Sequence, residues 1–161
     1  MSEPNIRLWR KNIKEIVTAE YPDARVTVKS NGDVFMRNPS TGTETFEGNL
    51  NDTDVCKQWS RYRVEELDAN LVGTVWYCQT KDAAVAVAAK CIQEGATGQI
   101  NIVDRGVTPC CIARIAADQK THRIHVIPGM FNRQQANDLK SAQWRSIVNY
   151  TRISYKEVNQ L

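Results

Sequence analysis

Glycine is sparse in this sequence, and long apolar runs are absent from it. Eight glycines in 161 residues form no GxGxxG or GxxxxGK[ST] loop of the kind that cradles phosphate groups. The longest apolar stretch, Ala83 to Ala89, is far too short to cross a bilayer. Arg7, Arg10, Lys11 and Lys14 interrupt every apolar segment near the N-terminus, so we expect no signal peptide. These absences favour a cytoplasmic protein that does not bind membranes.

Cysteine and histidine are too few and too scattered to indicate a metal or redox centre. The cysteines, an odd number without a CxxC pair, are Cys56, Cys78, Cys91, Cys110 and Cys111. No histidine or acid stands at a motif spacing that would activate the vicinal pair. His122 and His125 are an odd number of residues apart in an expected strand, so they point to opposite faces. We expect reduced, mostly buried thiols, with no metal and no cofactor.

Catalytic motifs are also missing, which favours a binding protein over an enzyme. The sequence contains neither HExxH nor GxSxG. The carboxylate pairs Glu65–Glu66 and Glu44/Glu47 have the residue type that acid–base catalysis uses, but nothing places either pair in a pocket. We therefore interpret them as solvated charge and assign no catalytic residue.

The composition otherwise indicates a globular fold. Hydrophobic residues make up 42% and charged residues 24% of the chain, which are ordinary values for a folded domain. We predict a single α+β domain over residues 1–150 and a polar C-terminal tail over residues 151–161. The net charge of +3 is small, so the distribution of the charges is more informative than their sum.

Hydrophobic periodicity and turn residues predict the order α-β-β-β-α-β-α-β-β-β-α. The expected helices cover residues 5–20, 52–67, 81–94 and 132–150, and the expected strands cover residues 25–29, 33–37, 43–47, 71–79, 99–104, 110–116 and 121–127. The strand at 71–79 is apolar on both faces, which predicts a central position. Together with helix 81–94 and strand 99–104 it forms a β-α-β unit. The expected fold is a mostly antiparallel sheet with helices packed on one face.

The register of the hairpin between Arg25 and Arg37 decides which of its residues face outward. A two-residue loop would mix apolar and charged residues on both faces. A three-residue loop over Ser30–Gly32 places Val28 opposite Val34. That register gathers on one face the apolar side chains Val26, Val28, Val34 and Met36. We predict the three-residue loop, because each Å² of apolar surface that this face buries is worth about 25 cal/mol.

The opposite face of the hairpin then presents cations around an aromatic ring. Its residues are Arg25, Thr27, Lys29, Phe35 and Arg37. Single-stranded nucleic acids are held by basic groups along the backbone and by aromatic rings on which bases stack. We therefore predict that this face binds single-stranded DNA or RNA with little sequence preference. Such a protein would coat the strand or assist transcription or replication, with a homo-oligomer as one arrangement.

Two further basic groups extend this prediction along the chain. Arg7, Arg10 and Lys14 form a basic stripe on the first helix, where they would steer the strand. The second group consists of Arg61, Tyr62 and Arg63, a basic and aromatic cluster. Arginine stacks on bases and pairs with phosphates, so both groups suit the same ligand.

A protein-interaction or regulatory module is the alternative function. Four tryptophans are many for a chain of this length, and tryptophan is a favoured anchor residue at interfaces. Trp9 and Trp144 both fall in terminal helices that would dock to a protein partner or to a second copy. The competing interpretation is that both rings fill the core.

A small enzyme is a further alternative. The segment from Thr74 to Phe131 combines a strand, Lys81–Asp82 at the start of an alanine-rich helix, a strand, a hairpin and then Ile127-Pro-Gly-Met-Phe131. In this order it resembles the phage-encoded S-adenosylmethionine lyases. The resemblance covers about a third of the chain and includes no diagnostic catalytic motif, so it assigns a role to no residue.

Overall fold

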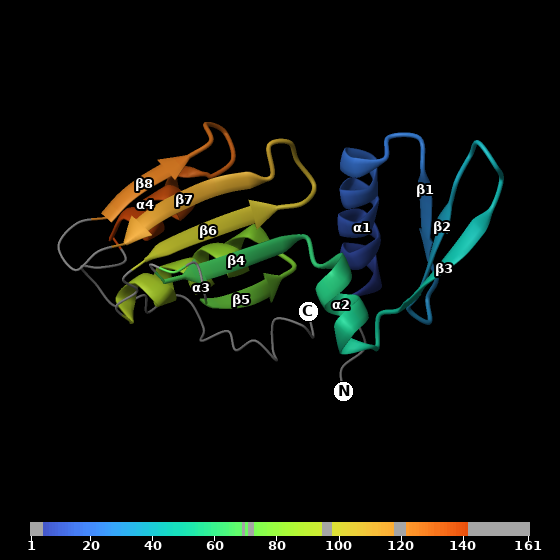
Figure 1. Ribbon diagram of the computed structural model, residues 1–161, viewed down its shortest axis with the longest axis horizontal. Coiled ribbons are helices and arrows are strands. Elements are labelled where there is room, and N and C mark those ends of the chain that lie inside the picture. The colour runs from blue at the N-terminus through green and yellow to red at the C-terminus, as the bar shows by residue number, and fades with distance from the viewer. Residues whose placement is uncertain (1–4, 69, 71–72, 95–97, 118–121, 142–161) are drawn as a thin grey trace.

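A computed structural model of the protein describes residues 5–68, 70, 73–94, 98–117 and 122–141. The helices and strands are α1 (Ile6–Glu20), β1 (Arg25–Val28), β2 (Asp33–Arg37), β3 (Glu44–Asn49), α2 (Thr53–Trp59), β4 (Tyr62–Leu67), β5 (Gly73–Cys78), α3 (Lys81–Gln93), β6 (Gln99–Asp104), β7 (Cys111–Ala117), β8 (His122–Val126) and α4 (Arg133–Ser141). The strands form two antiparallel sheets, β1-β2-β3 and β5-β4-β6-β7-β8, with α1 between them (Figure 1). This is the α+β class that the sequence predicts. Within the described ranges, no helix combines the length and the apolar character that a membrane span requires.

Helix α1 supplies the core of the three-stranded sheet. The side chain of Asn5 caps the helix by accepting a hydrogen bond from the backbone N–H of Leu8 at 3.2 Å. The apolar stripe at helical spacing is buried and consists of Trp9, Ile13, Ile16 and Val17. It packs with Val28 and Val34 of the hairpin. The helix therefore covers the inner face of this sheet.

The hairpin of β1 and β2 has the predicted three-residue loop. Its register runs from Arg25 opposite Arg37 to Val28 opposite Val34. Gly32 closes the loop with a φ of 95°, a left-handed conformation that glycine adopts without steric cost. The prediction of the register is confirmed, and with it the separation of the apolar and basic faces.

The predicted helix over residues 52–67 is wrong in its second half. Helix α2 ends at Trp59, and Ser60 has extended backbone with a ψ of 130°. Residues 62–67 form β4, which pairs with β5 on one side and with β6 on the other. Tyr62 and Val64 face the core, with exposed fractions of 6% and 0%. Buried side chains at a spacing of two are typical of a strand. Hydrogen bonding to two neighbouring strands further favours a strand over a helix for this segment.

Strand β5 lies at the edge of the five-stranded sheet, so the predicted central position of strand 71–79 is wrong. Residues 71 and 72 of that segment lie outside the described residues. Strand β4 is inserted between β5 and β6 and is antiparallel to both. Strands β5 and β6 are therefore parallel to each other, and α3 connects them as the predicted β-α-β unit. Helix α3 packs against all three strands.

The alanine-rich helix α3 is the centre of the second core. Every residue from Ala83 to Ala89 is buried, and the side chain of Thr80 accepts a hydrogen bond from the backbone of Ala83 at 3.1 Å. Helix α4 packs on α3 and begins with a reciprocal cap. In this cap Asn132 and Gln135 each accept a hydrogen bond from the other's backbone N–H, at 2.8 and 3.0 Å. The predicted extension of this helix to residue 150, and the predicted tail over 151–161, lie outside the described residues.

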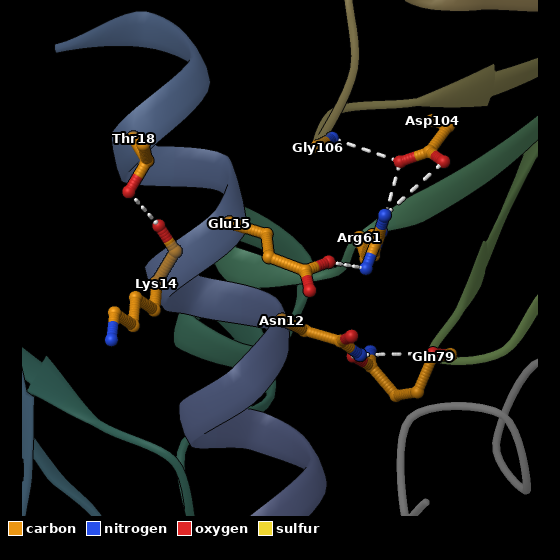
Figure 2. Close-up of polar contacts among 8 residues, drawn as sticks. All are labelled: Asn12, Lys14, Glu15, Thr18, Arg61, Gln79, Asp104 and Gly106. Atoms are coloured by element: carbon orange, nitrogen blue, oxygen red, sulfur yellow. Dashed lines mark hydrogen bonds and ion pairs between the residues drawn. The ribbon is translucent and has the colours of Figure 1, made fainter. Parts of the chain in front are cut away.

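A buried polar joint connects α1 to the second sheet (Figure 2). Asn12 is 2% exposed, and its Nδ2 donates a hydrogen bond to the carbonyl oxygen of Gln79 at 2.9 Å. The side-chain Nε2 of Gln79 in turn donates to the hydroxyl of Ser60 at 2.8 Å. Buried polar groups are stable when they are hydrogen-bonded. These three residues therefore join the helix to the sheet through hydrogen bonds.

Arg61 is the centre of the charged half of this joint (Figure 2). Its guanidinium pairs with Glu15 of α1, and its Nε lies 2.9 Å from Oδ1 of Asp104. Asp104 is 1% exposed and also accepts a hydrogen bond from the backbone N–H of Gly106 at 2.8 Å. One guanidinium is thus paired with two carboxylates, and this pairing counters part of the cost of desolvating the charges.

Candidate nucleic-acid interface

The outer face of the three-stranded sheet is the face turned away from α1. Strand alternation brings Arg25 and Thr27 of β1 onto it, beside Phe35 and Arg37 of β2, and Lys29, which follows β1, has its Nζ over the Phe35 ring. All of these side chains are exposed except Phe35, which is half-buried. In Figure 1 this sheet forms one end of the molecule, with α1 on its inner side. The structure therefore brings these five predicted residues together on a face that α1 does not cover.

The third strand adds a second aromatic ring to the outer face. Phe46 of β3 lies opposite Phe35, with the ring centroids 5.3 Å apart and the ring planes tilted by 54°. The Nζ of Lys29 lies 4.7 Å from the centroid of the Phe35 ring. Phe35 is partly covered by these contacts, whereas Phe46 is 57% exposed. The most accessible stacking surface is therefore Phe46, which the sequence reasoning did not include.

A β-bulge in β3 directly follows the aromatic pair. Phe35 pairs with Phe46, but the next pair along is Val34 with Gly48, so Glu47 is the extra residue. Without the bulge, Glu47 would lie opposite Val34, which is fully buried. Gly48 has a φ of 112°, and a Cβ atom added to it would lie 2.6 Å from a methyl carbon of Val55. The bulge thus places a glycine, and no carboxylate, where the second helix packs on the sheet.

The cations of the outer face are not neutralised by ion pairs. Among the described residues, Arg25, Lys29 and Arg37 form no salt bridge within 4.0 Å. Glu44 is the cross-strand neighbour of Arg37 but does not pair with it at this distance. The carboxylate of Asp33 accepts hydrogen bonds from the side-chain amides of Asn31 in the loop, at 3.1 Å, and Asn49 of β3, at 2.8 Å. The face therefore carries an excess of positive charge.

The predicted basic stripe of α1 lies beside the outer face and not on it. Arg7, Arg10 and Lys14 are exposed side chains of α1. Arg10 reaches the edge of the sheet, where its Nε donates a hydrogen bond to the carbonyl oxygen of Val28 at 2.7 Å. Arg10 thus adjoins the outer face across the free edge of β1. Lys14 lies on the other side, where it lines a recess with Thr18 and Gly106.

The predicted cluster of Arg61, Tyr62 and Arg63 is divided between three environments. Arg61 is held in the polar joint and is 13% exposed. Tyr62 is buried, and its pKa is raised to about 12 by burial and by the charge of Asp104. Arg63 lies on the face of the five-stranded sheet opposite Tyr62. The structure therefore places none of the three on the outer face.

No protein-family model, curated protein or solved structure matches the chain. The interpretation of the outer face therefore depends on its geometry and charge.

A cleft of about 500 Å³ on the inner side of the same sheet has the opposite charge. Its lining includes the carboxylates of Glu20, Asp23 and Glu47 and one cation, Arg37, and the cleft lies at the C-terminal end of α1, where the helix dipole is negative. Tyr21, which also lines this cleft, is 58% exposed. Three carboxylates against one cation give the cleft a negative lining, in contrast to the outer face.

The described cysteines follow the prediction of mostly buried thiols. Cys56, Cys78 and Cys91 are buried, whereas Cys110 is exposed and Cys111 is half-buried. Burial raises the pKa of Cys56 to about 11 and that of Cys78 to about 12. These thiols are therefore protonated and unreactive at neutral pH. In the described ranges, no three His, Cys, Asp or Glu side chains gather as a metal site would require.

The tryptophans that the structure describes belong to the cores. Trp9 is 1% and Trp59 is 5% exposed, and Trp76 is packed against the second core. Trp9 therefore fills the core instead of anchoring a partner. Trp144, the other tryptophan of the interaction hypothesis, lies outside the described residues.

In the segment that resembles the lyases, Lys81 contacts the C-terminal end of the segment. The ammonium group of Lys81 donates a hydrogen bond to the carbonyl oxygen of Met130 and lies 5.8 Å from the centroid of the Phe131 ring. The adjacent Asp82 accepts a hydrogen bond from Gln135 of α4 at 2.7 Å. Both side chains are thus used to hold the loop and α4 against α3.

Proposed function

We propose that the protein binds single-stranded DNA or RNA, with little sequence preference, on the outer face of β1-β2-β3. The observation that carries the proposal is the pair of Phe35 and Phe46 with three unpaired cations around it. A base stacks on the exposed ring of Phe46, because every base offers a π-face to an aromatic ring. Arg25, Lys29 and Arg37 contact the phosphates on either side.

The size of the face sets the expected salt dependence. Three phosphate contacts on a single strand give a slope of log K against log salt of about −2, since each contact contributes about 0.7. Arg10, at the edge of β1, would make this slope steeper by the same amount. Fluorescence anisotropy with a labelled oligo-dT across a salt series measures the slope. Absence of binding, or binding that does not respond to salt, contradicts the proposal.

The exposed ring provides the sharpest test. Phe46→Ala is expected to weaken binding to oligo-dT by about 5- to 150-fold, the value of one stacked base. Because more than half of the ring is exposed, the free energy of unfolding should fall by about 1 kcal/mol or less. Tyr21→Ala is the matched control, since Tyr21 is equally exposed but lines the acidic cleft.

The outcomes separate the proposal from its alternatives. Loss of binding in Phe46→Ala, with unchanged binding in Tyr21→Ala, supports the outer face. Equal affinities in both variants and the wild type would show that the ring is no stacking platform. Co-purification with a protein that withstands nuclease and high salt, without any affinity for oligo-dT, would favour the interaction module.

A further inference from the structure

The outer face of the three-stranded sheet changes in character from one edge to the other. At one edge, β1 and the residue after it carry the cations Arg25 and Lys29, and Arg10 of α1 reaches the backbone of the same strand (Figure 1). At the other edge, β3 contributes the exposed ring of Phe46 and the exposed carboxylate of Glu44 to this face. The face is therefore basic along β1, and aromatic and acidic along β3.

This gradient determines how a strand held by the proposed function would lie. Its phosphates would be attracted by the cations of β1 and repelled by Glu44, so the sugar–phosphate backbone would follow β1. The bases would extend across the sheet towards β3 and stack on Phe46. Arg25 and Lys29 are four residues apart, which is about 13 Å in an extended chain. The phosphates that they contact would thus lie on either side of the middle of β1.

Thr27 occupies the middle of β1, in one row with the aromatic pair. It lies opposite Phe35, and Phe35 lies opposite Phe46. Neighbouring strands are about 4.8 Å apart, so the backbone of Thr27 lies about 10 Å from that of Phe46. A nucleotide with its base on the aromatic pair and its phosphates on the cations would have its sugar at Thr27.

The hydroxyl of Thr27 is open to such a sugar. The side chain is exposed, and within the described part of the chain its hydroxyl makes no hydrogen bond. The hydroxyl of Thr18, by contrast, donates a hydrogen bond to the carbonyl oxygen of Lys14 at 2.7 Å. A threonine hydroxyl both donates and accepts hydrogen bonds. The 2′-hydroxyl of ribose does the same, and it is the group by which a protein distinguishes RNA from DNA.

We propose that the outer face prefers single-stranded RNA to single-stranded DNA, and that Thr27 is the residue that distinguishes them. This inference rests on the proposed function, because it requires a strand on this face. The hydroxyl of Thr27 hydrogen-bonds the 2′-hydroxyl of the nucleotide whose base stacks on the aromatic pair. One such hydrogen bond gives RNA an advantage of about 2- to 10-fold over DNA with the same bases. The cations and the rings add nothing to this preference, since RNA and DNA offer them the same phosphates and bases.

Fluorescence anisotropy of the full chain with labelled oligo-U and oligo-dU tests the preference, because these oligomers differ at the 2′ position alone. Thr27→Val replaces the hydroxyl by a methyl group and keeps the β-branched shape that suits a strand. This variant should bind oligo-dU as the wild type does and oligo-U about 2- to 10-fold more weakly, so that the two affinities become equal. Thr27→Ser keeps the hydroxyl and should retain the preference.

Thr45→Val is the matched control. Thr45 is an exposed threonine of β3 that lines the cleft on the inner side of the sheet, so its replacement should leave the preference unchanged. The slope of log K against log salt should be the same for both oligomers, because they carry the same phosphates.

The outcomes distinguish this inference from the function on which it rests. Equal affinities of the wild type for oligo-U and oligo-dU would overturn the preference for RNA and leave the proposed function intact. A preference that persists in Thr27→Val would overturn the role of Thr27. Absence of binding to both oligomers would overturn the preference and the proposed function together.

Discussion

Gly48 offers a direct test of how the β-bulge lets α2 pack on the three-stranded sheet. A Cβ at this position would lie 2.6 Å from Cγ2 of Val55, well inside van der Waals contact, and the φ of 112° strains any other residue. Gly42 is the matched control, because it has a φ of 70° but nothing within 4 Å of an added Cβ. Gly42→Ala should therefore report the backbone strain alone, about 1 kcal/mol. Gly48→Ala should cost about 2–4 kcal/mol, since the overlap with Val55 adds to the strain.

A double-mutant cycle separates the two contributions. Val55→Ala removes the methyl groups that the new Cβ would meet, so the cost of Gly48→Ala should fall in this background by about 1–2 kcal/mol. Urea denaturation followed by tryptophan fluorescence measures each free energy of unfolding, and one kcal/mol corresponds to about 2–4 °C in Tm at this size. If Gly48→Ala costs no more than Gly42→Ala, or if Val55→Ala gives no relief, the bulge does not have the role described.

Two other predictions concern the interior. Arg61→Met should destabilise the protein by about 3–5 kcal/mol in urea denaturation, because it leaves Asp104 as a buried carboxylate without its partner; a loss below about 1 kcal/mol would contradict this. The raised pKa values of Cys56 and Cys78 mean that the unfolded thiols ionise first. The urea midpoint should therefore fall as the pH rises above about 9, and Cys78→Ala should reduce this dependence. An unchanged pH dependence of the urea midpoint in Cys78→Ala would contradict the role of the buried Cys78 thiol in this dependence.

The outer face was largely predictable because strand alternation and one turn determine it. The loop at Gly32 sets the register, and the register assigns Arg25, Lys29 and Phe35 to one face. Phe46 was missed because its placement depends on the pairing of β3 with β2. Extending the second hairpin from Arg37 opposite Glu44 would have placed it opposite Phe35. The bulge that follows serves packing against α2, a long-range contact that local sequence patterns do not contain.

The second basic cluster was misplaced for a different reason. Trp59 and Tyr62 fit helical spacing, so the expected helix continued past Ser60 and placed the cluster on its surface. In residues 62–67 the buried side chains, Tyr62 and Val64, instead recur at a spacing of two. Pairing along both edges then favours a strand over a helix. Once β4 is central, Tyr62 faces the core, and Arg61 meets acids from α1 and β6. These partners are far apart in sequence, so no local pattern could indicate that Arg61 is already paired.

The burial of Asn12 has a consequence for how firmly the two sheets are aligned. Apolar surfaces tolerate sliding, because one methyl group replaces another at small cost. An amide side chain does not tolerate sliding. Any shift of α1 along its axis would leave the Asn12 side chain and the Gln79 carbonyl buried without hydrogen-bond partners. The helix therefore has a single low-energy position on the second sheet. That position fixes the orientation of the outer face of β1-β2-β3 relative to the rest of the molecule.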